Sequence, residues 1–372
     1  MILSCFVLTD ITLLLPFKDT CTSTMGRRCW PFTVEPVAFL TFFATTLLEI
    51  ISQKYVYNTI TKKDTSEDAN CNNTDLGIKI QSSNATEYWL LYINLASLLL
   101  AIPSTILLGI WSETEGRRAV LIVSLIGVML RAALYIIIVQ FQEPLYFFVI
   151  ASLLSSILGY NTSLMSSCMA SIADITSSRQ RTFQIILLDC ATGIGIGLAY
   201  FISGFCLECD WFHHFLWFAI ILCIINIVYI VCFLEDTIDF PSYRPTTICS
   251  YNDFVDFCRV FSYEPGNGRR WRLLMFAAAF FIGGIVITGA SDLIILYAQT
   301  SLCFPLVLVG YLSGALCLRF ITSLVGVKLL QTILKVSNNW IIEAGLLSFF
   351  AGLILATFSS STRLFFNGKF CY

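Results

Sequence analysis

The sequence predicts an all-α membrane protein, because apolar residues dominate it and fall into long runs. Hydrophobic residue types make up 57% of the 372 positions, and charged residues make up 12%. A bilayer core about 30 Å thick is crossed by roughly 20 apolar residues in helical form, since lipid offers the backbone no hydrogen-bond partner. We therefore predict about nine transmembrane helices, over residues 34–56, 88–110, 119–140, 146–170, 183–205, 213–234, 272–297, 305–327 and 340–358.

The longest interruption of this apolar pattern falls after the sixth predicted span. Residues 235–271 carry Pro241, Pro245 and Pro265 among charges of both signs, which is typical of a linker. We predict an N-terminal cytoplasmic segment (1–30), a six-helix bundle (31–234) and a cytoplasmic linker (235–271). A partial C-terminal bundle of three helices (272–359) and a short truncated tail (360–372) follow. Residues 1–24 are expected to be disordered or a gene-model extension, because their apolar stretch lacks a basic start and contains Asp10.

Charge and glycosylation motifs predict the same orientation in the membrane. Basic residues such as the pairs Arg117-Arg118 and Arg269-Arg270 fall in the loops that are cytoplasmic if the N-terminus is inside. The glycosylation sequons at Asn72 and Asn84 both fall in the 57–87 loop, which the same rule puts outside. The N-terminus is therefore predicted to be cytoplasmic.

The loop between the second and third spans reads from Gly109 to Arg118 as G-I-W-S-E-T-E-G-R-R. It resembles the major facilitator signature G-x-x-x-D-x-x-G-R-R, with Glu113 in place of the aspartate. Gly109 and Gly116 permit a tight turn, and a carboxylate that faces an arginine pair can latch one helical bundle to the next. The alternative is an ordinary positive-inside loop. Six helices, a long inner loop and further helices are also the organisation of the major facilitator fold.

Further segments resemble the solute carrier 46 family, which includes the proton-coupled folate transporter. They include Val34-Glu35-Pro36, Asp292 to Tyr297, and the string from Ala173 to Phe183, which contains Asp174, Arg179 and Arg181. These three charged residues are grouped with the gating motif. The resemblance implies twelve helices and solute transport driven by an ion gradient, usually of protons.

The resemblance also assigns roles to particular positions. It implies that Asp189 is the acidic residue of the fifth span and that Cys71 and Cys303 form a disulfide between external segments. The family's histidine in the seventh span falls near Val286, and its aspartate in the fourth span falls near Tyr160. Because both residue types differ here, a folate-like solute and another organic anion stay open as substrates.

Charged residues within predicted spans are candidate transport residues, because a charge at the bilayer centre costs roughly 2.5–3.5 kcal/mol and normally faces a cavity or a partner. Asp189 is followed by Gly193 and Gly197 on one helix face, where small residues let a neighbouring helix approach closely. A partly desolvated carboxylate at this seam suits a proton carrier. The alternative role of Asp189 is a structural bond to a neighbouring helix.

The remaining candidates are Glu49, Arg131, Asp292, Tyr311 and Arg319. Arg131 in the third span can attract an anionic solute, or pair with Asp189 or Glu49. Tyr311 and Arg319 are expected to line a cavity, although Arg319 can also reach the inner interface. Asp292 serves either a gate or a structural bond.

We therefore predict a secondary active transporter of a small organic, anionic solute, proton-coupled and working by alternating access. The alternative is a truncated, non-transporting or receptor-like remnant of the same fold, since three helices after the linker leave the second bundle incomplete. The expected partners are the solute, protons and the lipid bilayer. The expected location is the plasma membrane, or alternatively the lysosomal membrane.

Enzyme, metal and nucleic-acid functions are not expected. The chain has 2 His and 15 Cys, with a single C-x-x-C spacing at Cys206 and Cys209 and no second such pair, and no nucleophile and base pair is visible on its loops. We predict no cofactor and no metal site. A net charge of −2 gives no reason to expect a nucleic-acid partner.

Overall fold

A computed structural model of the chain describes residues 34–67, 75–176, 178–206, 212–234 and 316–332, with scattered positions in 271–285 and 340–354. Several predictions lie outside the described residues: those on the segment 1–30, most of the linker 235–271, Asn72, Cys71, Cys303, Asp292 and Tyr311. The side chains of Asn84, Arg179 and Arg319 are not described either. Their predicted roles therefore stay predictions.

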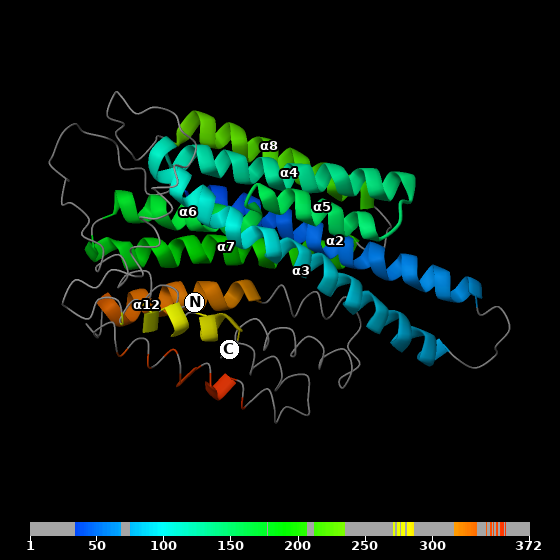
Figure 1. Ribbon diagram of the computed structural model, residues 1–372. Helices are drawn as coiled ribbons and strands as arrows, with labels where there is room; N and C mark the ends of the chain where they lie inside the picture. The colour runs from blue at the N-terminus through cyan, green and yellow to red at the C-terminus, as the bar shows by residue number, and fades with distance from the viewer. Residues whose placement is uncertain are drawn as a thin grey trace. The chain divides into compact units, whose positions relative to one another are not determined.

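The N-terminal half contains six membrane-spanning helical segments (Figure 1). The six predicted spans of this half are confirmed, with ends that differ by a few residues. The fourth span consists of two consecutive helices. The elements are α2 (Glu35–Glu67), α3 (Asp75–Glu115), α4 (Arg117–Phe141), α5 (Tyr146–Ile157) with α6 (Tyr160–Ile175), α7 (Ser178–Cys206) and α8 (Phe212–Phe233).

The C-terminal part is described in pieces. Helix α12 (Leu316–Thr332) overlaps the predicted eighth span, 305–327. The positions described within 271–285 and 340–354 are helical, and they fall within the predicted seventh and ninth spans apart from Trp271. The all-α fold class is confirmed, and a total of nine helices stays a prediction.

The burial pattern shows why lipid, and not water, surrounds these helices. In α8, Trp217, Ile221 and Ile225 are 57%, 51% and 50% exposed. Such a large apolar outer surface is stable only in contact with lipid. Helix α2 differs, because 72% of its most apolar window is buried, compared with 33% for α8 and 22% for α3. A polar side chain within α2 therefore meets the protein interior more often than lipid.

The predicted external loop 57–87 is shorter than expected. Helix α2 continues to Glu67, and α3 already begins at Asp75. Hydropathy marks where a helix leaves the membrane, and it does not mark where the helix ends. Residues such as Lys62, Lys63 and Glu67 are good helix formers in water, so the helix continues beyond its apolar part.

The predicted continuous span 146–170 is interrupted in its middle. Gly159 has φ 85° and Tyr160 has φ 42°, both in the left-handed region. The N–H of Gly159 donates to the Ser156 carbonyl at 3.0 Å, which closes the end of α5 with a tight turn. A Cβ on Gly159 would overlap Ser163 and Leu108, so only glycine fits this position.

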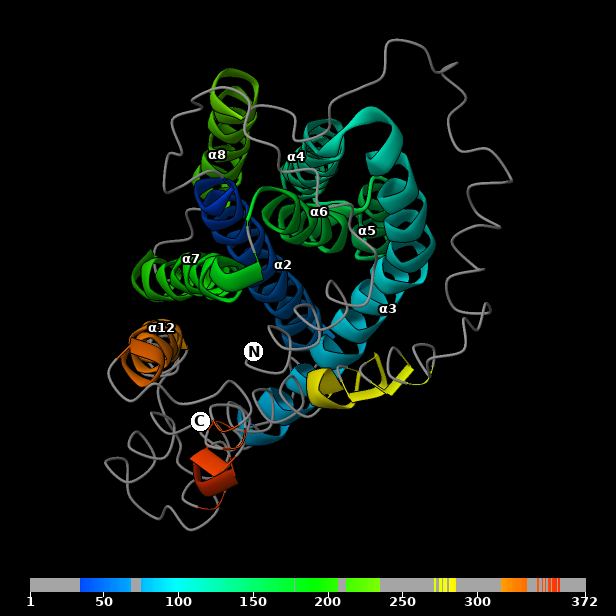
Figure 2. The same cartoon turned by 90° about the vertical axis from the view of Figure 1, so that its left-hand side faces the viewer.

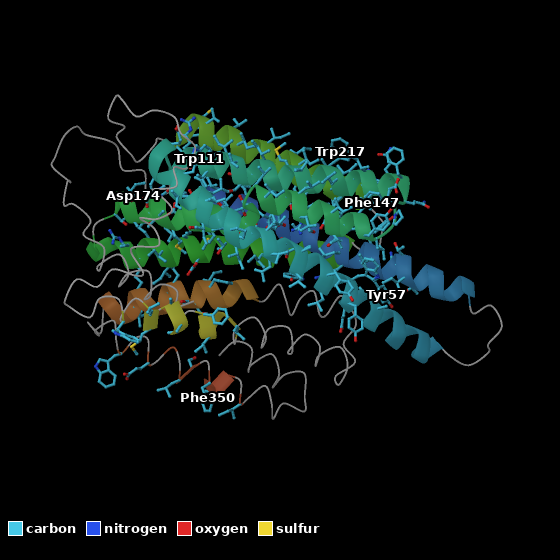
Figure 3. The ribbon with its side chains drawn as sticks, in the orientation of Figure 1. Tyr57, Trp111, Phe147, Asp174, Trp217 and Phe350 are labelled. Carbon is cyan, nitrogen blue, oxygen red and sulfur yellow. The ribbon has the colours of Figure 1, made fainter. Side chains whose placement is uncertain are left out.

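One compact unit contains α2 from Leu40, α3, α4, α5, α6 to Cys168 and α8. Within it, α4 packs against α8, α5 and α3, and α3 also packs against α5. Figure 2 looks along these helices and shows α4 between α8 and α3. A Cβ on Gly127 of α4 would lie 3.0 Å from the Leu158 Cβ, so the absence of a side chain allows α4 to approach the break closely. Trp111 and Phe147 lie toward opposite ends of this unit (Figure 3).

The second compact unit contains the end of α6, α7 to Gly204 and α12. Its helices meet where α7 lacks side chains. A Cβ on Gly193 would overlap the Phe320 ring of α12, so the ring fills the space that the glycine leaves. Lys328 of α12 also lies over the Phe183 ring, 5.4 Å from its centroid. Close approach at the glycine seam, as predicted from sequence, is confirmed at Gly193.

Candidate functional site

The best-defined polar site surrounds Arg131 in the middle of α4. This side chain is 4% exposed, and its Nη2 donates a hydrogen bond of 2.6 Å to the Ser152 hydroxyl. Its Cζ lies 4.3 Å from the ring centroid of Tyr160 and 5.8 Å from that of Tyr135. A cation over an aromatic face is stabilised by the ring quadrupole, and more strongly when both are shielded from water. The guanidinium is therefore fixed in one position.

The break in the fourth span sets the geometry of this site. Ser152 belongs to α5, whereas Tyr160 is the first residue of α6, so Arg131 contacts the span on both sides of its break. Tyr160 is 6% exposed and its hydroxyl has no hydrogen-bond partner among the described residues. The Nε of Arg131 is likewise buried without a partner there. Buried donors without partners are costly, so a ligand that accepts hydrogen bonds would gain affinity here.

Glu49 supplies the opposite charge from α2. It lies 14 residues after Glu35, about 21 Å along the helix and hence mid-span. Its side chain is exposed although Leu48 and Ile50 beside it are buried. It interacts electrostatically with Arg131 without a direct ion pair between them. Since α2 is the most buried of the described spans, Glu49 is an exposed charge in an otherwise buried stretch of helix.

Asp189 lies in the other compact unit, in the middle of α7. It is 7% exposed, and its carboxylate has no hydrogen-bond partner among the described residues. Its backbone carbonyl accepts a bond of 2.8 Å from the Thr192 hydroxyl, one turn ahead. Predicted pairing of Asp189 with Arg131 stays a prediction, and so does its proton-carrying role. A structural bond to a neighbouring helix is not present within the described residues.

The α3–α4 turn carries the predicted signature. Gly116 has φ 101° and precedes the first residue of α4, as the expected tight turn requires. Arg117 donates to the Ser112 hydroxyl, and Arg118 donates to the carbonyl of Val231 near the end of α8. A cation beside the last carbonyls of a helix is favourable, since these groups lack helical partners.

The carboxylate of the signature, Glu113, does not share the contacts of the two arginines. Glu113 is exposed and makes no hydrogen bond or ion pair with a described residue. A Cβ on Gly109 would meet nothing within 4 Å, so close packing does not explain this glycine. The described contacts of the signature therefore come from its two arginines. A latch through Glu113 stays a prediction.

The second part of the gating motif lies at the α6–α7 turn. The Nη2 of Arg181 donates to the carbonyls of Ala173 and Thr176, at 2.9 Å and 3.4 Å. This arginine thus closes the C-terminal end of α6. Asp174, the residue after Ala173, is half-buried and also makes contacts.

Sequence reasoning did not identify Ser152 and Tyr135 as site residues. Ser152, Ser155 and Ser156 form a polar cluster in an otherwise apolar span, which was an available signal for Ser152. Tyr135 follows Arg131 by one turn, so helical spacing places it on the same face. Among the described residues, no group of three His, Cys, Asp or Glu side chains is placed to hold a metal ion.

The fold and this mid-span charged site define a membrane transporter of the major facilitator type. The family model described as Major Facilitator Superfamily matches residues 36–372. The crystal structure of the human organic anion transporter MFSD10 superposes with a TM-score of 0.64, at 16% identity, covering 91% of this chain and 80% of that one. That likeness concerns the fold alone.

Two curated relatives narrow the classification. The proton-coupled folate transporter of Rattus norvegicus is 32% identical over 342 residues, covering 90% of this chain and 73% of the relative. The lysosomal proton-coupled steroid conjugate and bile acid symporter of Gallus gallus is 26% identical over 353 residues, covering 90% and 75%. The chain therefore belongs to the major facilitator superfamily and, within it, to solute carrier family 46. It is a multi-pass membrane protein of a transporter family and not of an enzyme family.

Proposed function

We propose that this protein is a proton-coupled carrier of a small organic anion, working by alternating access. The observation that carries the proposal is Arg131, a buried cation in the middle of its span whose Nε has no hydrogen-bond partner among the described residues. A buried charge costs free energy unless a partner compensates it. An anionic ligand could compensate Arg131 and accept a charge-assisted hydrogen bond from its Nε. The names of the relatives, which specify folate, steroid conjugates and bile acids, support the same class of solute.

Proton coupling is the second part of the proposal. Both curated relatives are named as proton-coupled, and this chain carries a buried carboxylate at Asp189 that has no hydrogen-bond partner among the described residues. A buried carboxylate can bind a proton within the bilayer, because its neutral form needs no counter-ion there. We assign Asp189 as a proton carrier on this basis.

The test uses full-length protein in proteoliposomes, with labelled folate, estrone sulfate and taurocholate as parallel probes. We expect uptake of at least one probe to be faster with pH 5.5 outside than with pH 7.4. Arg131→Gln should abolish this uptake, whereas Gln140→Ala at the exposed end of the same helix should leave it unchanged. Equal uptake by the wild type and Arg131→Gln would overturn the assignment of the solute site.

Asp189→Asn tests the coupling assignment separately. We expect this variant to insert normally and to lose acceleration by an inward proton gradient. Unchanged acceleration would remove the assigned role of Asp189. Tagged protein should be seen in the plasma membrane or the lysosomal membrane, and the low-pH side of the assay then corresponds to the cell exterior or the lysosomal lumen.

A further inference from the structure

We infer that Glu49 and the anionic solute compete for Arg131, so that the solute binds only when Glu49 takes up a proton. This inference rests on the proposed function and adds a second proton-binding group, located in the solute site itself. The proton comes from the aqueous phase to which the site is open and bonds to a carboxylate oxygen of Glu49. It returns to water on the other side when the solute leaves and Glu49 again compensates Arg131.

The first support is the position of the two charges. Glu49 and Arg131 each lie 14 residues from the cytoplasmic end predicted for their helix, marked by Glu35 and Arg117. Both therefore lie about 21 Å along their spans and at similar depth. They interact electrostatically without forming an ion pair with each other.

The second support is that only one of the two charges is immobilised. Arg131 is held by the Ser152 hydroxyl and the Tyr160 ring, so it remains in place whether or not the site is occupied. Glu49 makes no side-chain hydrogen bond to a described residue, and its side chain is exposed. Gln53, one turn further along α2, is exposed as well and continues the polar face. Glu49 is thus the less constrained of the two charges.

The third support is the charge balance of the site. Without solute, ionised Glu49 and Arg131 give a net charge of zero. A bound monoanion would make the net charge −1 beside the buried guanidinium of Arg131, where an uncompensated charge is costly. A proton on Glu49 restores neutrality. By linkage, solute binding and proton binding at Glu49 must then favour each other by the same factor.

Few other ionisable groups are coupled to Glu49 in this unit. Among the described residues, the groups that interact electrostatically with its carboxylate are Arg131 of α4 and Tyr160 of α6. The phenol of Tyr160 carries no charge at neutral pH. Glu49 is therefore the carboxyl group in the described part of this site, and the inference assigns the exchanged proton to it.

The experiment measures probe affinity with equal pH on both membrane faces, so that no proton gradient contributes. Exchange of the labelled monoanions estrone sulfate and taurocholate by proteoliposomes with full-length protein is followed at pH 5.5 and pH 7.4. For each probe that the wild type exchanges, we expect the KM to be roughly tenfold higher at pH 7.4, the size of an ordinary coupling between two sites. Glu49→Gln should have the low KM at both pH values, since its side chain cannot compete for Arg131.

Two control variants sharpen the result. Glu49→Asp should keep the pH dependence, and Gln53→Ala, one turn away on the same exposed face, should keep it as well. A Glu49→Gln protein with the wild-type pH dependence would overturn the inference. Loss of binding at both pH values would also overturn it, because Glu49 would then contact the solute itself.

A second measurement does not depend on the folding of Glu49→Gln. Purified Asp189→Asn protein is used, so that Asp189 itself contributes no proton. The protein is titrated in weakly buffered detergent solution with a probe that the wild type exchanges, and the pH change is recorded. About one proton should be taken up for each probe molecule bound, in keeping with the linkage argument; binding without proton uptake would contradict the inference. If the wild type exchanges none of the probes, the proposed function fails. If the wild type exchanges a probe and Glu49→Gln keeps the wild-type pH dependence of the KM, only the inference about Glu49 is rejected.

Discussion

The guanidinium of Arg131 lies over the ring of Tyr160, with 4.3 Å between Cζ and the ring centroid. Tyr160 adopts φ 42°, a backbone conformation that is uncommon for a residue with a side chain, directly after the glycine that breaks the fourth span. The chain break and the cation contact thus occur at the same residue. The interruption of this span therefore coincides with the aromatic face that lies against Arg131.

Replacement of the Tyr160 ring should weaken solute binding. Tyr160→Leu removes the cation–π contact, which is worth about 2 kcal/mol when desolvated, or roughly 30-fold in the apparent affinity. Tyr160→Phe keeps the ring and should change the KM by about twofold at most, because the hydroxyl has no partner among the described residues. The KM of exchange and the melting temperature in detergent are measured for both. Equal damage by the two variants would show that the hydroxyl, and not the ring, matters.

The contact between Gly193 and Phe320 should be sensitive to a single methyl group. Gly193→Ala places a Cβ against the Phe320 ring and should lower the free energy of unfolding by about 1–3 kcal/mol. Gly326→Ala in α12 is the matched control, since its Cβ would meet nothing within 4 Å, and it should be neutral or slightly stabilising.

Thermal unfolding in detergent measures both glycine variants. The double variant Gly193→Ala with Phe320→Ala should recover part of the loss, because the smaller side chain makes room for the added methyl group. Strictly additive effects of these two changes would contradict the contact.

The buried hydrogen bond between α8 and α2 should contribute measurably to stability. Asn226 donates from Nδ2 to the hydroxyl of Thr41 at 2.8 Å, and both residues are buried. Asn226→Leu and Thr41→Val should each destabilise the protein, with a coupling energy of about 0.6–1.7 kcal/mol in the double-mutant cycle. Ser166→Ala, at an exposed position of α6, serves as a neutral control. A coupling energy of zero would mean that the bond does not form in the membrane.

The signature turn allows its two interpretations to be separated by mutation. Arg118 contacts the Val231 carbonyl at the end of α8, so Arg118→Gln should cost about 1–2 kcal/mol of stability and Arg118→Lys less. Glu113→Gln should have little effect on stability, because that side chain is exposed. Melting temperatures measure all three variants. A larger effect of Glu113→Gln than of Arg118→Gln would favour the carboxylate latch that the sequence predicts.

The sequence by itself determined the class of protein, because the length and polarity of each apolar run are properties of the chain alone. It located six spans, the tight turn at Gly116, the close approach at Gly193 and the mid-span charges Glu49, Arg131 and Asp189. It did not reveal how far α2 and α3 extend beyond the membrane, since hydropathy measures contact with lipid and not helix length.

Only the tertiary structure decided what surrounds each charge. Arg131, Ser152 and Tyr160 lie on three helices, and their contact depends on the break at Gly159 and on the packing of α4 against α5. The exposure of Glu49 beside the buried Leu48 and Ile50 likewise follows from how the helices surround α2. Helical spacing fixes which residues share a face, whereas the partner of that face depends on contacts between distant parts of the chain.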